Sequence, residues 1–293
     1  MSRPLTIAAV QAAPVPIGTA LDGFRADVRQ HRAAGADLVV YPELHLFGTE
    51  SWPVEQNEAR LRAASVTLDS PFVDELRATA RDAGVWLVPG SICERGEDAE
   101  LYNTALAISP DGTLVASYRK VFPWRPFEPY DPGDRFVTYG LDAGTVGLSI
   151  CYDAWFPEVT RHLAWMGAEV VANIVKTTTP DRAQELVLAR ANSIVNQTFT
   201  VSVNCAGPVG MGQSIVVDPE GGVLATAGVD PEVLMVTLDL DHVDRVREHG
   251  TAGSNRMWSQ FLPTDAALEL PLYEGRIDPH RWEPRIPSTP SAR

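Results

Sequence analysis

The sequence is poor in cysteine and histidine, and both shortages narrow the class of protein. Its three cysteines, Cys93, Cys151 and Cys205, are odd in number and form no Cys-x-x-Cys pair. A disulfide framework and a cysteine zinc site are therefore not expected, and a reducing cytoplasm is favoured. The six histidines are scattered and none stands four positions from another, so the sequence predicts no metal site.

Positive charge and long apolar runs are also in short supply. The chain has 24 Lys and Arg against 38 Asp and Glu, a net charge of −14. This balance argues against nucleic acid or an anionic membrane as a partner. No apolar stretch approaches the roughly 18 residues that a membrane span needs. The first residues read as a strand rather than a signal peptide, because glutamine and prolines interrupt their apolar run.

What the sequence does contain is a regular alternation of strand and helix patterns. Helices are predicted over 20–34, from Ser70-Pro71 to Gly84, from Pro157 to Gly167, and after Thr179-Pro180. Strands are predicted over 5–11, 37–43, 85–93, 145–151 and 168–175, with a hairpin over 103–120. No linker interrupts the pattern, so we predict one α/β domain over residues 1–260 and an extended tail over 261–293.

Three of the predicted strands end in a reactive side chain: Glu43, Lys120 and Cys151. Taken singly, each has an ordinary explanation, since a free cysteine is commonly a small buried hydrophobe and surface acids and lysines are frequent. Together they form a complete set for acyl transfer. The thiol attacks, the carboxylate moves the proton, and the ammonium and the backbone N–H of Tyr152 stabilise the oxyanion.

The segments around these residues resemble a known superfamily. The blocks "VVYPELHLFG", "YRKVFPW" and "LSICYDAWFPEVTRHLAWMGAEVV" are similar, in order and spacing, to the signature blocks of the carbon–nitrogen hydrolase (nitrilase) superfamily. The resemblance covers about residues 5 to 245. It implies an α-β-β-α sandwich, a Glu-Lys-Cys triad without a cofactor, and pairing through the helical face into a homodimer or a higher homo-oligomer.

A fourth candidate catalytic residue is Glu128, eight positions beyond Lys120 in "KVFPWRPFEPYDPGD". This segment resembles the aliphatic amidase and formamidase branch, and the resemblance implies a second carboxylate that positions the lysine and accepts a substrate N–H. The alternative is a surface acid paired with Arg125.

The residues after the cysteine bear on the substrate. Tyr152-Asp153 resembles the amidase branches, whereas nitrilases proper have Trp-Glu there. Relatives that bind carboxylates carry arginine among the next positions, where this chain has Ala154, Trp155 and Phe156. A buried carboxylate without such a partner would lose hydration at a high cost, so a small, neutral, partly apolar amide is favoured.

Five side chains are candidates for binding that amide: Trp124, Tyr130, Trp155, Phe156 and Asn173. Packing at a helix start explains Trp155 and Phe156 equally well. Two other functions stay open at this point. One is a nitrilase, or an acyltransferase that passes the acyl group to an amine, and the other is a catalytically silent scaffold.

Overall fold

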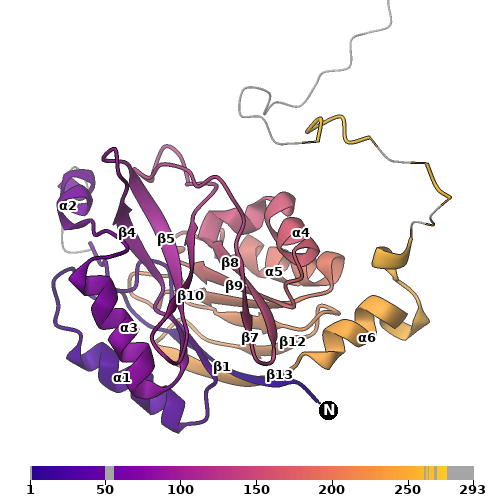
Figure 1. The fold of residues 1–293 in the computed structure, drawn as a ribbon, viewed down its shortest axis with the longest axis horizontal. Helices are drawn as coiled ribbons and strands as arrows, with labels where there is room; N and C mark the ends of the chain where they lie inside the picture. The colour runs from indigo at the N-terminus through magenta and orange to yellow at the C-terminus, as the bar shows by residue number, and fades with distance from the viewer. Residues whose placement is uncertain (1, 50–55, 261, 263, 267–268, 276–293) are drawn as a thin grey trace, which may run out of the picture.

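The computed structural model describes residues 2–49, 56–260, 262, 264–266 and 269–275. Its centre consists of two β-sheets packed face to face (Figure 1). The first sheet runs in the order β13 (Glu232–Asp239), β1 (Pro4–Gln11), β2 (Leu38–Val40), β3 (Trp86–Val88), β5 (Leu101–Ile108) and β4 (Ser91–Arg95), and β6 (Leu114–Arg119) pairs with β5. The second runs in the order β12 (Val223–Thr226), β11 (Ile215–Val217), β10 (Phe199–Asn204), β9 (Val170–Val175), β8 (Gly144–Ile150) and β7 (Thr138–Leu141).

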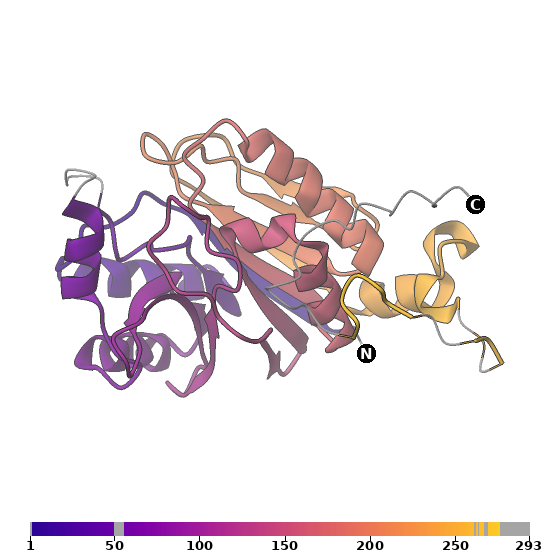
Figure 2. The same cartoon turned by 90° about the horizontal axis from the view of Figure 1, so that it is seen from above.

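Helices cover the outer face of each sheet. The first sheet carries α1 (Asp22–Ala33) and α3 (Pro71–Ala83), and the second carries α4 (Pro157–Trp165) and α5 (Arg182–Asn196). Figure 2 shows the two pairs on opposite sides of the sheets. Two further helices, α2 (Asn57–Ala64) and α6 (Asp241–His249), flank this body, and short 3₁₀ helices span Cys151–Trp155 (η2), Thr251–Gly253 (η3) and Met257–Ser259 (η4). The predicted α-β-β-α sandwich is confirmed.

The core lies mainly between the two sheets. Ile7 and Val40 of the first sheet and Leu148 and Ala172 of the second are buried together there. Side chains alternate across each strand, so neighbours such as Val171 point to the other face and pack against α4. The central strands β1, β2 and β3 are parallel, as are β8, β9 and β10. Parallel strands end at the same edge, which brings the loops that follow them together.

Local signals set several boundaries as predicted. Ser70 caps α3 by accepting the N–H of Val73, and Gly84 ends that helix in the left-handed conformation. The single strand predicted over 85–93 is wrong, because the chain breaks at Pro89-Gly90 into β3 and β4. Gly90 has φ +91°, a conformation that glycine adopts easily and a regular strand does not.

None of the helices in the described part of the chain has the length and apolar character of a membrane span. The tail predicted over 261–293 falls mostly outside the described residues. Its described part, 262, 264–266 and 269–275, contains only turns and irregular backbone. The division at residue 260 stays a prediction.

Candidate active site

The three reactive residues follow strands of both sheets. Glu43 comes shortly after β2, Lys120 directly after β6, and Cys151 directly after β8 as the first residue of η2. Cys151 has φ +47°, so the chain turns sharply at the candidate nucleophile. A non-glycine residue in this left-handed region is strained, and such strain is found most often at functional sites.

Lys120 is the centre of the site. Its side chain is fully buried, and Nζ lies 3.1 Å from Oε1 of Glu43 and 2.8 and 2.9 Å from the two oxygens of Glu128. Burial alone would lower the pKa of Lys120, but the charges of Glu43 and Glu128 outweigh it and hold that pKa well above the ordinary value. Lys120 is therefore a cation at neutral pH, the state in which its ammonium could stabilise a developing oxyanion.

Glu43 is held by a second contact besides the lysine. The side chain is buried, and Oε1 also accepts a hydrogen bond of 2.6 Å from Nδ2 of Asn103, a residue of β5. The lysine and the asparagine thus contact the same oxygen, Oε1. The carboxylate is fixed in orientation by these neighbours, which is what proton transfer over a short distance requires.

Glu128 comes from the loop between β6 and β7, and it pairs with Lys120 rather than with Arg125. Its Oε2 accepts the backbone N–H of Trp124 at 2.9 Å, which ties the loop to the site. Burial raises the pKa of Glu128, and Lys120 opposes this rise. In the described part of the chain no group of three His, Cys, Asp or Glu side chains stands together as metal ligands, and the lysine ammonium occupies the position between these two acids.

Cys151 is half-buried, with Sγ 3.8 Å from Oγ1 of Thr177. Burial raises the pKa of the thiol well above its ordinary value, and the charge of Glu43 raises it further, while Lys120 lowers it. Because the charges of Glu43 and Lys120 both act on this sulfur, the three residues form one cluster. A neutral thiol is a weak nucleophile, so attack by Cys151 would require a base to take its proton.

The turn at the cysteine is supported by Asp153, whose structural part the sequence did not reveal. Asp153 is buried and accepts three hydrogen bonds: 2.8 Å from the Tyr118 hydroxyl, 2.9 Å from the Ile150 N–H and 3.0 Å from the Phe122 N–H. These donors come from β6, from β8 and from the segment after Lys120. One side chain thereby fixes the segments that carry Lys120 and Cys151 relative to each other. The one signal in the sequence is that Asp153 is an acidic residue within a largely apolar segment, which indicates a buried carboxylate with hydrogen-bond partners.

Three of the predicted substrate-binding aromatics lie on the segments next to the catalytic residues. Phe156 stacks on Phe122 with ring centroids 3.7 Å apart. Trp124 packs on Phe127 at 4.4 Å. Trp155 is half-buried, and its Nε1 has no hydrogen-bond partner among the described residues. Their placement agrees with either pocket lining or local packing, and their role in binding stays a prediction.

The other two predicted binding residues are buried and hydrogen-bonded to their neighbours. Tyr130 is buried, and its hydroxyl lies 3.3 Å from Sγ of Cys93. Asn173 donates to Oγ of Ser149 at 3.1 Å and accepts from Oγ of Ser202 at 3.3 Å. Asn173 lies on the face of β9 that is turned away from the core between the sheets. No hydrogen bond joins either side chain to Cys151 in the described part of the chain, and their role in binding stays a prediction.

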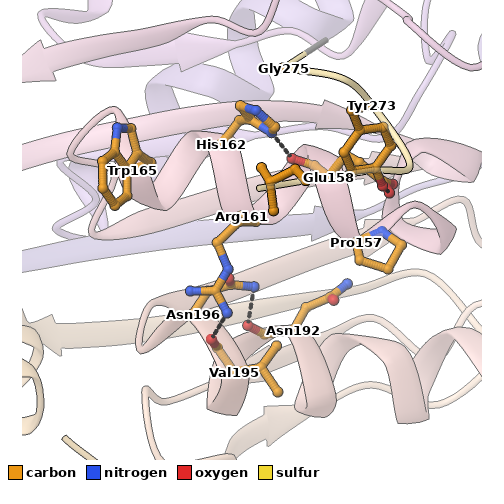
Figure 3. A pocket seen from close by; sticks show the side chains of 11 residues that line it. Pro157, Glu158, Arg161, His162, Trp165, Asn192, Val195, Asn196, Tyr273 and Gly275 are labelled. Carbon is orange, nitrogen blue, oxygen red and sulfur yellow. Dashed lines mark hydrogen bonds between the residues drawn. The ribbon is translucent and has the colours of Figure 1, made fainter. Parts of the chain in front are cut away.

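A groove of about 570 Å³ lies elsewhere, on the helical face of the second sheet (Figure 3). Glu158, Arg161 and Trp165 of α4 line one side, and Asn196 of α5 lines another. Tyr273 from the C-terminal segment reaches over it and hydrogen-bonds to Glu158. None of the catalytic candidates lines this groove, so it is a separate feature of the molecule.

Comparison with known proteins identifies the family of this chain. Residues 6–248 match the carbon–nitrogen hydrolase family, and the chain belongs to that family. The predicted membership of the nitrilase superfamily is therefore confirmed, and with it the class of enzyme, a hydrolase acting on carbon–nitrogen bonds other than peptide bonds.

Relatives of known sequence point to amides. A formamidase from Photorhabdus laumondii is 32% identical over 84% of this chain and 76% of its own length. A formamidase from Pseudomonas syringae is 30% identical over 75% of this chain, which spans only 65% of that protein. The deaminated glutathione amidase of Rattus norvegicus is 32% identical over 80% of this chain and 78% of its own length.

Solved structures agree with the fold. Nit3 from Saccharomyces cerevisiae, a member of branch 10 of the nitrilase superfamily, superposes with a TM-score of 0.75 at 26% identity, covering 84% of this chain and 93% of its own. An amidase variant from Nesterenkonia sp. AN1, whose active-site cysteine carries the acetamide moiety of fluoroacetamide, has a TM-score of 0.70 at 28% identity. That match covers 82% of this chain and 92% of the amidase.

Proposed function

We propose that this protein hydrolyses a small, neutral, partly apolar amide through a thioester on Cys151. The observation that carries the proposal is the buried Lys120 ammonium, which contacts Glu43 and Glu128 together and whose charge acts on Cys151. Burying a lysine and two acids beside a half-buried thiol has a high desolvation cost, which packing alone does not explain. The groups in this cluster are those that acyl transfer requires.

The first half of the reaction forms the acyl-enzyme. The Cys151 thiol gives its proton to Glu43 while sulfur bonds to the amide carbon. The oxygen becomes an oxyanion, which the Lys120 ammonium and the backbone N–H of Tyr152 stabilise. Each such donor contributes about 3 kcal/mol to lowering the barrier. Glu43 then passes the proton to nitrogen, the C–N bond breaks, and ammonia or an amine leaves a thioester.

The second half releases the acid. Glu43, again a carboxylate, takes a proton from water as the water oxygen attacks the thioester carbon. The same donors stabilise the second oxyanion. The C–S bond then breaks, the carboxylic acid leaves, and the thiolate recovers a proton from Glu43. Glu128 positions Lys120 through both steps and accepts an N–H of the substrate. No cofactor enters this scheme.

Residues 152–156 support a neutral substrate, because none of them is a cation that could pair with a substrate carboxylate. The aromatic pair Phe122 and Phe156, stacked beside the turn at the cysteine, supports a partly apolar one. The formamidases among the relatives are consistent with a short acyl group.

Mass spectrometry of the intact protein tests this function. The wild type is incubated with formamide, acetamide, propionamide and butyramide, quenched in acid and searched for an acyl adduct. We expect the adduct on Cys151, ammonia release with at least one amide, and neither in Cys151→Ala. Cys205→Ala, which changes a buried cysteine outside the site, should keep both.

The other outcomes identify the alternative functions. Conversion of nitriles in preference to amides would identify a nitrilase. An N-substituted amide, rather than the free acid, as the main product with an added amine would identify an acyltransferase. A folded wild type with neither adduct nor ammonia on the whole panel would contradict the proposal and favour a silent scaffold.

We also propose that a second copy of the chain covers the groove on α4 and α5. Trp165, on the rim, is 75% exposed, and Ile194 and Val195 are also exposed on α5. Exposed apolar side chains on adjacent helices are typical of an association surface. Trp165→Glu should lower the mass found by light scattering to that of a monomer, 31.9 kDa. A wild-type monomer would contradict this. The cytoplasmic location stays a prediction.

A further inference from the structure

A second network of side chains meets the nucleophile from the side of α5. Thr177, buried just after β9, places Oγ1 3.8 Å from Sγ of Cys151. The same hydroxyl lies 2.8 Å from both oxygens of Glu185. None of the catalytic steps of the proposed reaction uses Thr177 or Glu185. Thr177 is nevertheless the polar side chain that contacts the sulfur from this side, and Glu185 contacts Thr177.

The donors and acceptors of this network can be assigned. A carboxylate only accepts hydrogen bonds, so the single hydrogen of the Thr177 hydroxyl points to Glu185. The lone pairs of the hydroxyl oxygen are then left for Cys151. Thr177 can therefore accept a hydrogen bond from the S–H group but cannot donate one to a thiolate. A separation of 3.8 Å is within the range of a hydrogen bond that involves sulfur.

Arg182 and Asn204 keep this arrangement in place. Arg182 is almost completely buried, and Nη1 lies 3.0 Å from Oε2 of Glu185 while Nη2 donates to the Gln213 carbonyl at 2.9 Å. The backbone N–H of Thr177 donates to Oδ1 of Asn204 at 2.8 Å. The ion pair keeps Glu185 an acceptor, and the bond to Asn204 fixes the position of the threonine.

We propose that Thr177, oriented by Glu185, is a positioning residue that accepts the S–H hydrogen bond of Cys151 and keeps the resting nucleophile a neutral thiol. The inference rests on the proposed role of Cys151 as the nucleophile. In this arrangement the thiolate forms only when substrate and Glu43 take over the proton. The enzyme gains a resting thiol that is slow to react with oxidants and with stray electrophiles.

Most of the charges around Cys151 also favour the neutral thiol. Besides burial, the carboxylates of Glu43, Glu185 and Glu128 raise the pKa of the thiol, and the ammonium of Lys120 lowers it. Among the described residues, Glu43, Glu128 and Lys120 share no hydrogen bond or ion pair with Thr177 or Glu185. Changes at Thr177 or Glu185 therefore report on this second network alone.

The test is the pH dependence of alkylation of Cys151 by iodoacetamide, followed by peptide mass spectrometry so that only this cysteine is counted. Thr177→Val has nearly the shape of threonine but no hydroxyl. We expect its alkylation profile to shift to lower pH, with a rate at neutral pH about three- to tenfold above that of the wild type. Glu185→Gln should shift the profile in the same direction because a negative charge is lost.

Two controls separate positioning from packing. Thr177→Ser keeps the hydroxyl and should keep the wild-type profile. Thr178→Val places the same change one residue along, at an exposed position, and should also keep it. If Glu185→Gln fails to fold because Arg182 loses its partner, Thr177→Val still decides, since it leaves the ion pair intact.

An unchanged profile in Thr177→Val, or a shift to higher pH, would overturn the inference. An equal shift in Thr177→Ser would do the same, because the hydroxyl would then not be the cause. Alkylation needs no substrate, so these results are independent of turnover. Absence of any acyl adduct in the wild type would contradict the proposed function instead, and would leave the alkylation result standing.

Discussion

The Nζ atom of Lys120 lies 2.8 and 2.9 Å from the two oxygens of Glu128, closer than the 3.1 Å that separates it from Oε1 of Glu43. The lysine is thus shared unequally between two acids. Glu128 meets the lysine through both of its oxygens, whereas Glu43 meets it through one. This difference supports the proposed roles, in which Glu128 positions the lysine and Glu43 acts as the base.

Glu128→Gln tests that division. Without the charge of Glu128, Lys120 would pair with Glu43 alone, and Glu43 would become a weaker base. We expect kcat for ammonia release to fall about 100-fold, which is the lower range for loss of general acid–base assistance, while the protein stays folded. Glu97→Gln, the same change at an exposed position, is the matched control. Wild-type kcat in Glu128→Gln would contradict the positioning role.

Lys120→Met should destabilise the fold as well as abolish turnover. It leaves Glu43 buried and Glu128 largely buried without their cation, and removing one partner of a buried ion pair costs about 3–5 kcal/mol. Urea unfolding at one fixed protein concentration measures the loss. In the Glu128→Gln background the same substitution should cost clearly less, because one carboxylate fewer is left unpaired. An equal cost in both backgrounds would show that the two acids do not depend on the lysine.

Gly90 links the path of the backbone to the catalytic base. A Cβ at this position would lie 2.1 Å from the carbonyl oxygen of Pro42, the residue before Glu43. Gly90→Ala should therefore displace Glu43, lowering kcat as well as stability. Gly84 is a matched control, since it too has positive φ but has nothing within 4 Å of the added Cβ. Gly84→Ala should cost about 1 kcal/mol of stability and leave kcat unchanged. Equal kcat in the two variants would contradict the argument.

The sequence predicts those residues of the site that directly follow a strand better than those that lie elsewhere. Glu43, Lys120 and Cys151 follow strands, and the pattern of strands is readable because apolar runs and turn residues mark them. Loops after the strands of such sheets lie close together, so these residues can be grouped from the sequence alone. Thr177 also follows a strand, β9, but Glu185 and Asp153 carry no comparable local signal. Their partners come from other elements and are decided by packing.

The placement of Asn173 shows a second limit. Every residue of β9 is buried, because the strand has the other sheet on one face and helices on the other. The alternation of apolar and polar residues that reveals the inner face of a strand is then absent. The sequence therefore does not indicate which face of β9 carries Asn173, and its role in binding stays a prediction. The break at Gly90 was missed for a related reason, since buried strands on both sides of it gave one continuous apolar run.

The stability of the site should depend on pH through Asp153. Burial raises the pKa of this carboxyl to about 6, although Lys120 and the hydrogen bonds from Ile150, Phe122 and Tyr118 lower it. In the unfolded chain the same group titrates near pH 3.9. Between these two values the folded state holds a proton that the unfolded state has lost. The free energy of unfolding contributed by Asp153 therefore falls as pH rises from about 4 to 6, by up to roughly 3 kcal/mol.

Other groups titrate in the same range, so the prediction concerns the difference between the wild type and Asp153→Asn. Urea unfolding of both proteins at several pH values from 4 to 8, at one concentration, gives that difference. The unfolding free energy of the wild type relative to that of Asp153→Asn should decrease as pH rises from about 4 to 6. Above about pH 6 the difference should stay constant. Asparagine does not titrate, so the change comes from Asp153 alone. A constant offset can accompany the substitution, since the asparagine amide meets a hydrogen-bond donor where the carboxylate accepted one. If the difference instead moved in favour of the wild type, the hydrogen bonds from Tyr118 and the backbone would outweigh burial.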